Sequence, residues 1–306
     1  MKYLTTLLLA AFILTGCNPS GKREAGSESA KSTGSAESAE MTAPAEFVLT
    51  KIWATDSTLL TCESVLYDKD RDRLYVPCIN GNPTDKDGNG YIALLNTDGS
   101  IEEMEWSTGL NAPKGMGVFG DRLYVTDIDE VVEIDVTSGE ILRRIPVEGA
   151  SFLNDISIDS NGDIYFSDSD TGIVWVYSDG TLNRWITEGL ERPNGLYVEE
   201  SRVLLTSSGS QDLKIIDKES GEYETVTTGI GAGDGVEFTG MEGHYLTSSW
   251  TGEVFLIFPD FSKKSLLKTS DQEINSADIG FNQSEQVVYV PTFFDNRVVA
   301  YRLEKE

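Results

Sequence analysis

Short runs of alternating apolar and polar residues, separated by Gly, Asn, Asp and Ser, follow one another from about residue 46 onward. Residues 154–159 form one such run, and 163–167 form the next after a Ser-Asn-Gly turn. Two more runs, 173–177 and 182–186, are bounded by turns that contain Gly172 and Gly180. This period-two pattern predicts antiparallel strands joined in hairpins. No segment keeps apolar residues three and four positions apart, so we expect little helix.

One short pattern recurs six times, and we call the first residue of each copy a register residue. The steps between successive copies are 51, 40, 40, 40 and 43 residues. A repeat of about 40 to 50 residues made of short strands is typical of β-propellers. We therefore predict an all-β fold, a six-bladed β-propeller with four-stranded blades around a central channel. An open β-sandwich is the alternative, but it does not account for the fixed period. The register residues are Glu63, Lys114, Asn154, Asn194, Asp234 and Ala277.

The two ends of the repeat region are expected to meet. Residues 46–56 have the pattern of a strand and precede the first register residue. We predict that they complete the last blade beside residues 298–302. Such closure would remove an exposed sheet edge, and it makes 46–306 one propeller domain.

The beginning of the chain predicts a lipoprotein signal peptide. Lys2 precedes an apolar run, 7–14, that is too short to span a bilayer. The run ends in Leu-Thr-Gly-Cys17, which resembles a bacterial lipobox. We expect residues 1–16 to be removed and the Cys17 thiol to be acylated, which would anchor the protein to a membrane of the cell envelope. A signal peptide with a chance cysteine is the alternative.

Composition limits the partners of the remaining chain. Residues 17–45 are rich in Ser, Ala, Glu, Gly and Lys, so we expect an acylated cysteine followed by a flexible tether. The formal net charge is −27, and removal of Lys2 with the signal peptide makes it −28. Nucleic acid is therefore excluded as an expected partner, because its binding needs clustered Lys and Arg. We expect a monomer whose partners are a small-molecule substrate or ligand and, through the lipid, the membrane.

Two cysteines remain in the domain. The segment from Glu63 to 76 reads as a hairpin, and its midpoint places Cys62 opposite Cys78. Export would allow a disulfide to persist, but cross-strand geometry is restrictive. The sequence leaves open whether Cys62 and Cys78 are bridged.

The register residues include a set of oxygen ligands. In a propeller these residues begin the innermost strands and face the mouth of the channel. Glu63, Asn154, Asn194 and Asp234 would bring two carboxylates and two amide oxygens together. Hard divalent cations such as calcium prefer such a mixture. The alternative is that these residues only cap turns, where Asn and Asp are common.

The chain resembles the gluconolactonase family, six-bladed propellers that include the senescence marker protein and the luciferin-regenerating enzyme. The resemblance covers most of residues 60–305. It rests on Glu63 in Thr-Cys-Glu-Ser-Val-Leu-Tyr-Asp, Asn154 in Leu-Asn-Asp-Ile-Ser-Ile-Asp, Asn194 in Arg-Pro-Asn-Gly-Leu and Asp234 in Gly-Asp-Gly-Val. The resemblance implies that Glu63, Asn194 and Asp234 hold one divalent metal, calcium first, with zinc and manganese as alternatives.

The same resemblance implies a chemistry, which is hydrolysis of a lactone or related ester; the expected lipid anchor at Cys17 would place it at the cell envelope. The metal would polarise the carbonyl and hold a water. Asp234 would be the catalytic base, and Asn154 would bind water or substrate beside it. Lys114 is a second candidate for substrate binding, by supplying a cation for an anionic substrate; it could instead neutralise nearby carboxylates.

Three departures from the family pattern bear on specificity. Phe152 stands where the family often has an Arg that grips substrate, Ser64-Val replaces Gly-Pro after Glu63, and Ile156 stands where Gly is common. Metal binding would survive these changes, but the expectation of a sugar lactone would not. A non-catalytic propeller that binds a small ligand or a protein partner is the alternative function.

Overall fold

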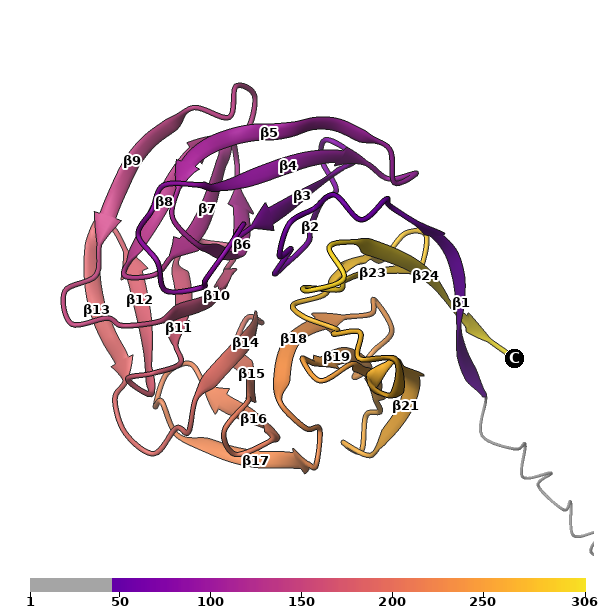
Figure 1. Ribbon diagram of the computed structural model, residues 1–306. Coiled ribbons are helices and arrows are strands. Elements are labelled where there is room, and N and C mark those ends of the chain that lie inside the picture. The colour runs from indigo at the N-terminus through magenta and orange to yellow at the C-terminus, as the bar shows by residue number, and fades with distance from the viewer. Residues whose placement is uncertain (1–45) are drawn as a thin grey trace, which may run out of the picture. The chain divides into compact units, whose positions relative to one another are not determined.

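A computed structural model describes residues 46–306 as a six-bladed β-propeller. Within these residues, 24 strands form six four-stranded antiparallel sheets, set as blades around a central axis (Figure 1). The one helical element in this part of the chain is a short turn of 3-10 helix, η1 (Ser270–Gln272). The predicted fold class is therefore confirmed, as is the expected scarcity of helix.

The first five blades each use four consecutive strands, with the first strand innermost (Figure 1). Blades one and two are β2 (Leu66–Asp68), β3 (Arg73–Cys78), β4 (Gly90–Asn96), β5 (Ile101–Leu110), then β6 (Pro113–Phe119), β7 (Arg122–Asp127), β8 (Glu130–Asp135), β9 (Ile141–Pro146). Blades three and four are β10 (Leu153–Ile158), β11 (Ile164–Asp168), β12 (Ile173–Ser178), β13 (Thr181–Ile186), then β14 (Pro193–Val198), β15 (Arg202–Ser207), β16 (Asp212–Asp217), β17 (Tyr223–Thr228). Blade five is β18 (Gly233–Phe238), β19 (Tyr245–Ser249), β20 (Glu253–Ile257), β21 (Lys263–Lys268).

The sixth blade joins both ends of the domain. Its inner strands are β22 (Gly280–Asn282), β23 (Val287–Pro291) and β24 (Val298–Lys305), and its outermost strand is β1 (Phe47–Ala54). Strands β1 and β24 run antiparallel, from Phe47 opposite Lys305 to Ala54 opposite Val299. The predicted closure is confirmed, and it lies at the right of the ring in Figure 1.

Six of the seven clusters of the hydrophobic core each lie between two neighbouring blades. One cluster, for example, packs Leu74 and Val76 of β3 against Tyr289 of β23 and Ala300 of β24. Because each blade is covered on both faces, its middle strands are apolar on both faces too. The six residues of β4 from Gly90 to Leu95 are all buried. Clear alternation therefore survives mainly in the outer strands, such as β13.

Four innermost strands carry a β-bulge at the register residue. The strand register shifts between Leu153 and Ile156 in β10, and at the equivalent place in β6, β14 and β18. A bulge adds a residue to one strand and redirects its side chains. Consecutive residues such as Asn154 and Asp155 can thus both line cavities of the channel instead of alternating between the blade's two faces.

Glycine follows the register residue where neighbouring innermost strands approach closely. A Cβ on Gly195 would lie 1.9 Å from the carbonyl oxygen of Asp234 in the next blade. A Cβ on Gly235 would lie 2.3 Å from Oδ1 of Asp278 in the blade after that. These two glycines set how near the inner strands can come, and hence where the side chain of Asp234 lies.

The cysteines of the domain lie as predicted but carry free thiols. Cys62 and Cys78 form an isolated antiparallel bridge pair, both fully buried and both unbonded to one another. The structure thus supports the predicted pairing of positions and shows no bond between the two sulfurs.

The expectations for the beginning of the chain fall on residues that the structure does not describe. They are the signal peptide 1–16, the acylated Cys17 and the tether 17–45. From residue 46 onward, no helix is long and apolar enough to cross a membrane.

Candidate functional site

Five of the six register residues line one cavity of about 310 Å³ where the innermost strands begin. They are Glu63, Lys114, Asn154, Asn194 and Asp234. The sixth, Ala277, is buried behind the wall in a small cluster with Ile79 and Phe293, which line the cavity. The structure therefore brings together the predicted ring, although the roles assigned to its members stay predictions.

Three oxygens in this cavity are buried without a hydrogen-bond partner. They are Oε2 of Glu63, Oδ1 of Asn194 and Oδ1 of Asp234, one from each predicted metal ligand. Buried polar atoms are nearly always paired, because an unpaired one costs about 1–3 kcal/mol. Three orphaned oxygens facing one cavity are the donor set that a hard divalent cation prefers, so the residues present fit such an ion.

The three candidate metal ligands include only two carboxylates. Among residues 46–306 there is no group of three or more His, Cys, Asp and Glu side chains arranged to hold a metal. Glu63 and Asp234 supply the two carboxylates of the candidate set, and Asn194 completes it with an amide oxygen. A cation here would depend on an uncharged ligand as well as on charge.

Electrostatics around the two carboxylates are unfavourable in the absence of a cation. Burial and the nearby charge of Asp278 raise the pKa of Glu63 to about 8, and Lys114 acts in the opposite direction. Burial and the charges of Glu63 and Asp278 raise the pKa of Asp234 well above its usual range. Burial is the larger cause of both shifts and repulsion between carboxylates the smaller, and a bound cation would oppose both by favouring the charged forms.

Lys114 is held by main-chain carbonyls and by an aromatic ring. Its side chain is buried, and Nζ donates to Ala112 O at 2.9 Å and to Pro83 O at 3.2 Å. The ammonium also lies 4.5 Å from the centre of the Phe152 ring. Burial lowers the pKa of Lys114 to about 8, against the pull of the Glu63 charge. No salt bridge joins Lys114 to a carboxylate in the described part of the chain, so it neutralises Glu63 only at a distance.

A buried aspartate, Asp168, shapes the loop that leads into the inner strand β10. Asp168, at the end of β11, accepts hydrogen bonds from the backbone N–H groups of Ser151 and Phe152, each at 3.0 Å. The next residue, Ser169, accepts one from the Asn154 amide at 3.1 Å. These bonds orient Phe152 and Asn154 beside Lys114.

Hydroxyl groups tie neighbouring blades together at the register residues. Thr126 donates to the carbonyl oxygen of Asn154, and Thr206 donates to that of Asp234. Ser248 donates to the carbonyl oxygen of Ala277 at 2.7 Å. Each bond joins the second strand of one blade to the register residue of the next, so the ring of candidate ligands is held by contacts between blades.

The comparisons with known proteins show the fold and no more. No family model matches the chain, and no curated protein matches its sequence. Among solved structures, one described as "Streptogramin B lyase structure" aligns with a TM-score of 0.60 and 13% identity. The alignment covers 85% of this chain and 98% of that one. At this identity the likeness supports the propeller, and the resemblance to the gluconolactonase family stays a prediction.

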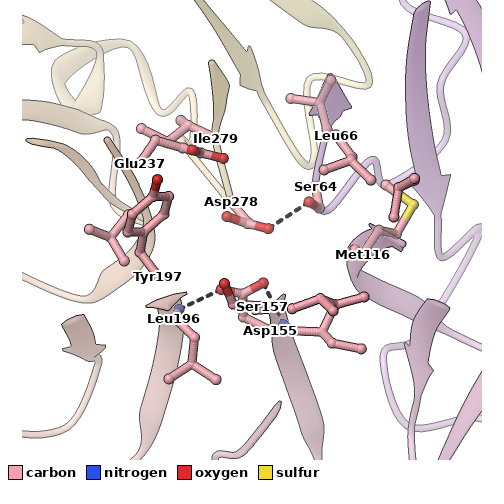
Figure 2. A pocket seen from close by; sticks show the side chains of 16 residues that line it. Ser64, Leu66, Met116, Asp155, Ser157, Leu196, Tyr197, Glu237, Asp278 and Ile279 are labelled. Atoms are coloured by element: carbon pink, nitrogen blue, oxygen red, sulfur yellow. Dashed lines mark hydrogen bonds between the residues drawn. The ribbon is translucent and has the colours of Figure 1, made fainter. Parts of the chain in front are cut away.

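A second polar cavity, of about 190 Å³, lies along the same channel and was not predicted. Figure 2 shows Ser64, Asp155 and Asp278 pointing into it. Ser64 donates to Asp278 at 2.6 Å, and the backbone N–H of Leu196 donates to Asp155 at 2.5 Å. Burial raises the pKa of Asp278 to about 7. The sequence did contain a signal for this cavity. Ser64, Asp155 and Asp278 each directly follow a register residue, whereas the other three repeats have Gly at that position.

The aromatic rim of the first cavity was also missed. Trp250, Phe293 and Phe294 line it, together with Phe152. The adjacent phenylalanines in the sixth repeat were the available signal, but their direction depends on a left-handed backbone at Phe293, where φ is 50°.

Proposed function

We propose that the protein is a metal-dependent hydrolase of a lactone or related ester. The observation that carries the proposal is the orphaned oxygen on each of Glu63, Asn194 and Asp234, all lining one cavity. These three residues would hold the cation, for which calcium is the first choice. Bound there, the cation would polarise the substrate carbonyl and acidify a water.

The chain's own residues would position the substrate and deprotonate the attacking water. Asp234 would accept a proton from the attacking water, since Asn154 and Asn194 cannot transfer protons. Lys114 has three donors and uses two of them on Pro83 and Ala112, which leaves one for the substrate oxygen. The Asn154 amide, oriented by Ser169, would bind substrate or water beside it.

The decisive experiment removes one proposed ligand from the full chain. Asp234→Ala should lose calcium binding, measured by calorimetry, and should lose any lactone hydrolysis with it. Asp260→Ala is the matched control, because Asp260 is an exposed turn residue that accepts only from Ser262. If Asp234→Ala kept both the calcium affinity and the activity of the control, the proposed site would be wrong.

A lyase is the second candidate, favoured by the described activity of the structural neighbour. Hydrolysis adds one water to the substrate, whereas elimination opens the same ring with no gain in mass. Mass spectrometry of the product therefore separates the two reactions. Calcium binding without turnover of any ester or lactone would favour the third possibility, a propeller that only binds its ligand.

A further inference from the structure

The rim of the candidate metal cavity is built from aromatic side chains on two blades. Trp250 follows β19, and Phe293 and Phe294 follow β23. The Phe293 and Phe294 rings meet edge to face at 4.7 Å between centroids, and Trp250 meets Phe293 in the same manner at 5.5 Å. Phe294 is 65% exposed, far more than any other large apolar side chain of the described residues. An exposed ring at a cavity mouth, supported from behind by two others, is a surface ready for an apolar ligand.

The remaining wall is also apolar. Phe152 stands across from this group in the third blade, and Ile79, Pro83 and Ala232 fill the spaces between. Half of the cavity's lining residues are therefore apolar, and four of these are aromatic. Ligand sites of this kind combine apolar walls with a few fixed polar groups.

Several polar groups of the wall already have partners within the protein, and Lys114 keeps one donor free for the substrate carbonyl. Arg192 donates to Asp170 at 2.6 Å, and Ser208 donates to the main-chain oxygen of Arg192 at 3.3 Å. The Asn154 amide nitrogen is used by Ser169. The orphaned polar atoms lining the cavity belong to the three candidate metal ligands. A ligand with many hydroxyl groups would lose its hydration on entering and find few partners in return.

We propose that the cavity selects lactones or esters with a compact apolar group, such as an aromatic ring, over polyhydroxylated sugar lactones. The carbonyl would lie toward Glu63, Asn194 and Asp234, and the apolar group would lie against Trp250 and Phe294. A cavity of about 310 Å³ has room for a ligand of one or two rings. The selection of an ester substrate rests on the proposed hydrolase function, whereas the preference for an apolar group rests on the wall alone.

The test uses two six-membered lactones, aromatic dihydrocoumarin and polyhydroxylated glucono-δ-lactone, with the full chain and calcium. The aromatic lactone should have a kcat/KM about tenfold higher or more. Phe294→Ser should reduce that preference by about 3- to 10-fold, the effect of one lost aromatic contact. Its calcium affinity should stay unchanged, because Phe294 supplies no candidate ligand. Phe119→Ser, an exposed aromatic outside the cavity, is the matched control and should alter neither lactone's rate.

A binding measurement keeps the inference separate from the proposed function. The corresponding lactams, 3,4-dihydroquinolin-2-one and glucono-δ-lactam, resist hydrolysis and can be titrated by calorimetry. Tighter binding of the aromatic lactam, weakened by Phe294→Ser, supports the inference even if neither lactone is hydrolysed and the hydrolase proposal fails. Equal or tighter binding of the polyhydroxylated lactam overturns the inference, even if calcium-dependent hydrolysis is found. An unchanged preference in Phe294→Ser overturns it as well.

Discussion

The close approach of β14 and β18 predicts that Gly195→Ala damages both the fold and the candidate site. The new Cβ would lie 1.9 Å from the Asp234 carbonyl oxygen and 2.7 Å from Oγ1 of Thr206. Thr206 donates to that same carbonyl, so both atoms belong to one bond between blades. To reach an ordinary contact of 3.4 Å, the strand that carries Asp234 must retreat by about 1.5 Å.

The expected loss of stability follows from that displacement. Overpacking of this kind costs about 1–3 kcal/mol. Replacing Gly by Ala in a strand returns roughly 0.5–1 kcal/mol through the entropy of the unfolded chain. The net loss of about 0.5–2 kcal/mol corresponds to a Tm lowered by roughly 1–8 °C in a domain of this size. Calcium affinity should fall about tenfold or more, because ligand distances tolerate only about 0.2 Å.

Differential scanning calorimetry and calcium titration measure the two effects. Gly81→Ala is the matched control: Gly81 is exposed, and a Cβ there would meet its first atom, Nδ2 of Asn89, at 3.8 Å. The control should keep its Tm and its calcium affinity. If Gly195→Ala equalled Gly81→Ala in both measurements, the reasoning that glycine sets the spacing of the inner strands would be refuted.

Two further predictions concern groups away from the site. Burial raises the pKa of Cys62 to about 12, and it raises that of Cys78 well above its usual value. In the Cys17→Ser variant, a disulfide-exchange reagent should therefore label no thiol of the native protein at pH 8. After unfolding without reductant it should label two thiols. No labelling of the unfolded protein would mean that Cys62 and Cys78 are bridged. Burial alone would raise the pKa of Asp159, but a 2.9 Å bond from Lys218 and backbone donors lower it. Lys218→Met should thus lower the free energy of unfolding by about 1.5–3 kcal/mol at pH 7. This difference from wild type should shrink as the pH falls below about 4, because a carboxylate whose pKa is lowered by folding stabilises the protein only while it is ionised. A difference in Tm that stays constant down to pH 3 would contradict this prediction.

Local patterns were sufficient to predict the fold of the third blade. Its turns at Gly162, Gly172 and Gly180 all have positive φ, as hairpins of this kind require, and the four strands begin within one residue of their predicted starts. The 40-residue spacing then carried this result to the other blades and placed five register residues in one cavity.

Features that depend on contacts between blades or on local backbone irregularities could not be predicted in the same way. The bulge at Asn154 and Asp155 sends consecutive side chains to two different cavities, which a strict period of two does not allow. Lys114 is held by the carbonyl oxygen of Pro83, which comes from a loop of another blade. The orientation of Phe293 depends on one left-handed residue. The Lys114 contact is decided by a neighbour that is distant in sequence, whereas the bulge and the left-handed residue are local backbone irregularities that a periodic pattern does not encode.

The pairing of β1 with β24 also has a consequence for the order of folding. Phe47 opposes Lys305, so the last blade cannot be completed until β24 has been synthesised. Until then β1 has no partner strand, and any preceding blades that had already folded would expose the faces of the two end blades. Because the closing contact spans nearly the whole domain, we expect ring closure to be a late and slow step in folding. A nascent chain of this protein would need protection from aggregation for as long as it takes to translate all six repeats.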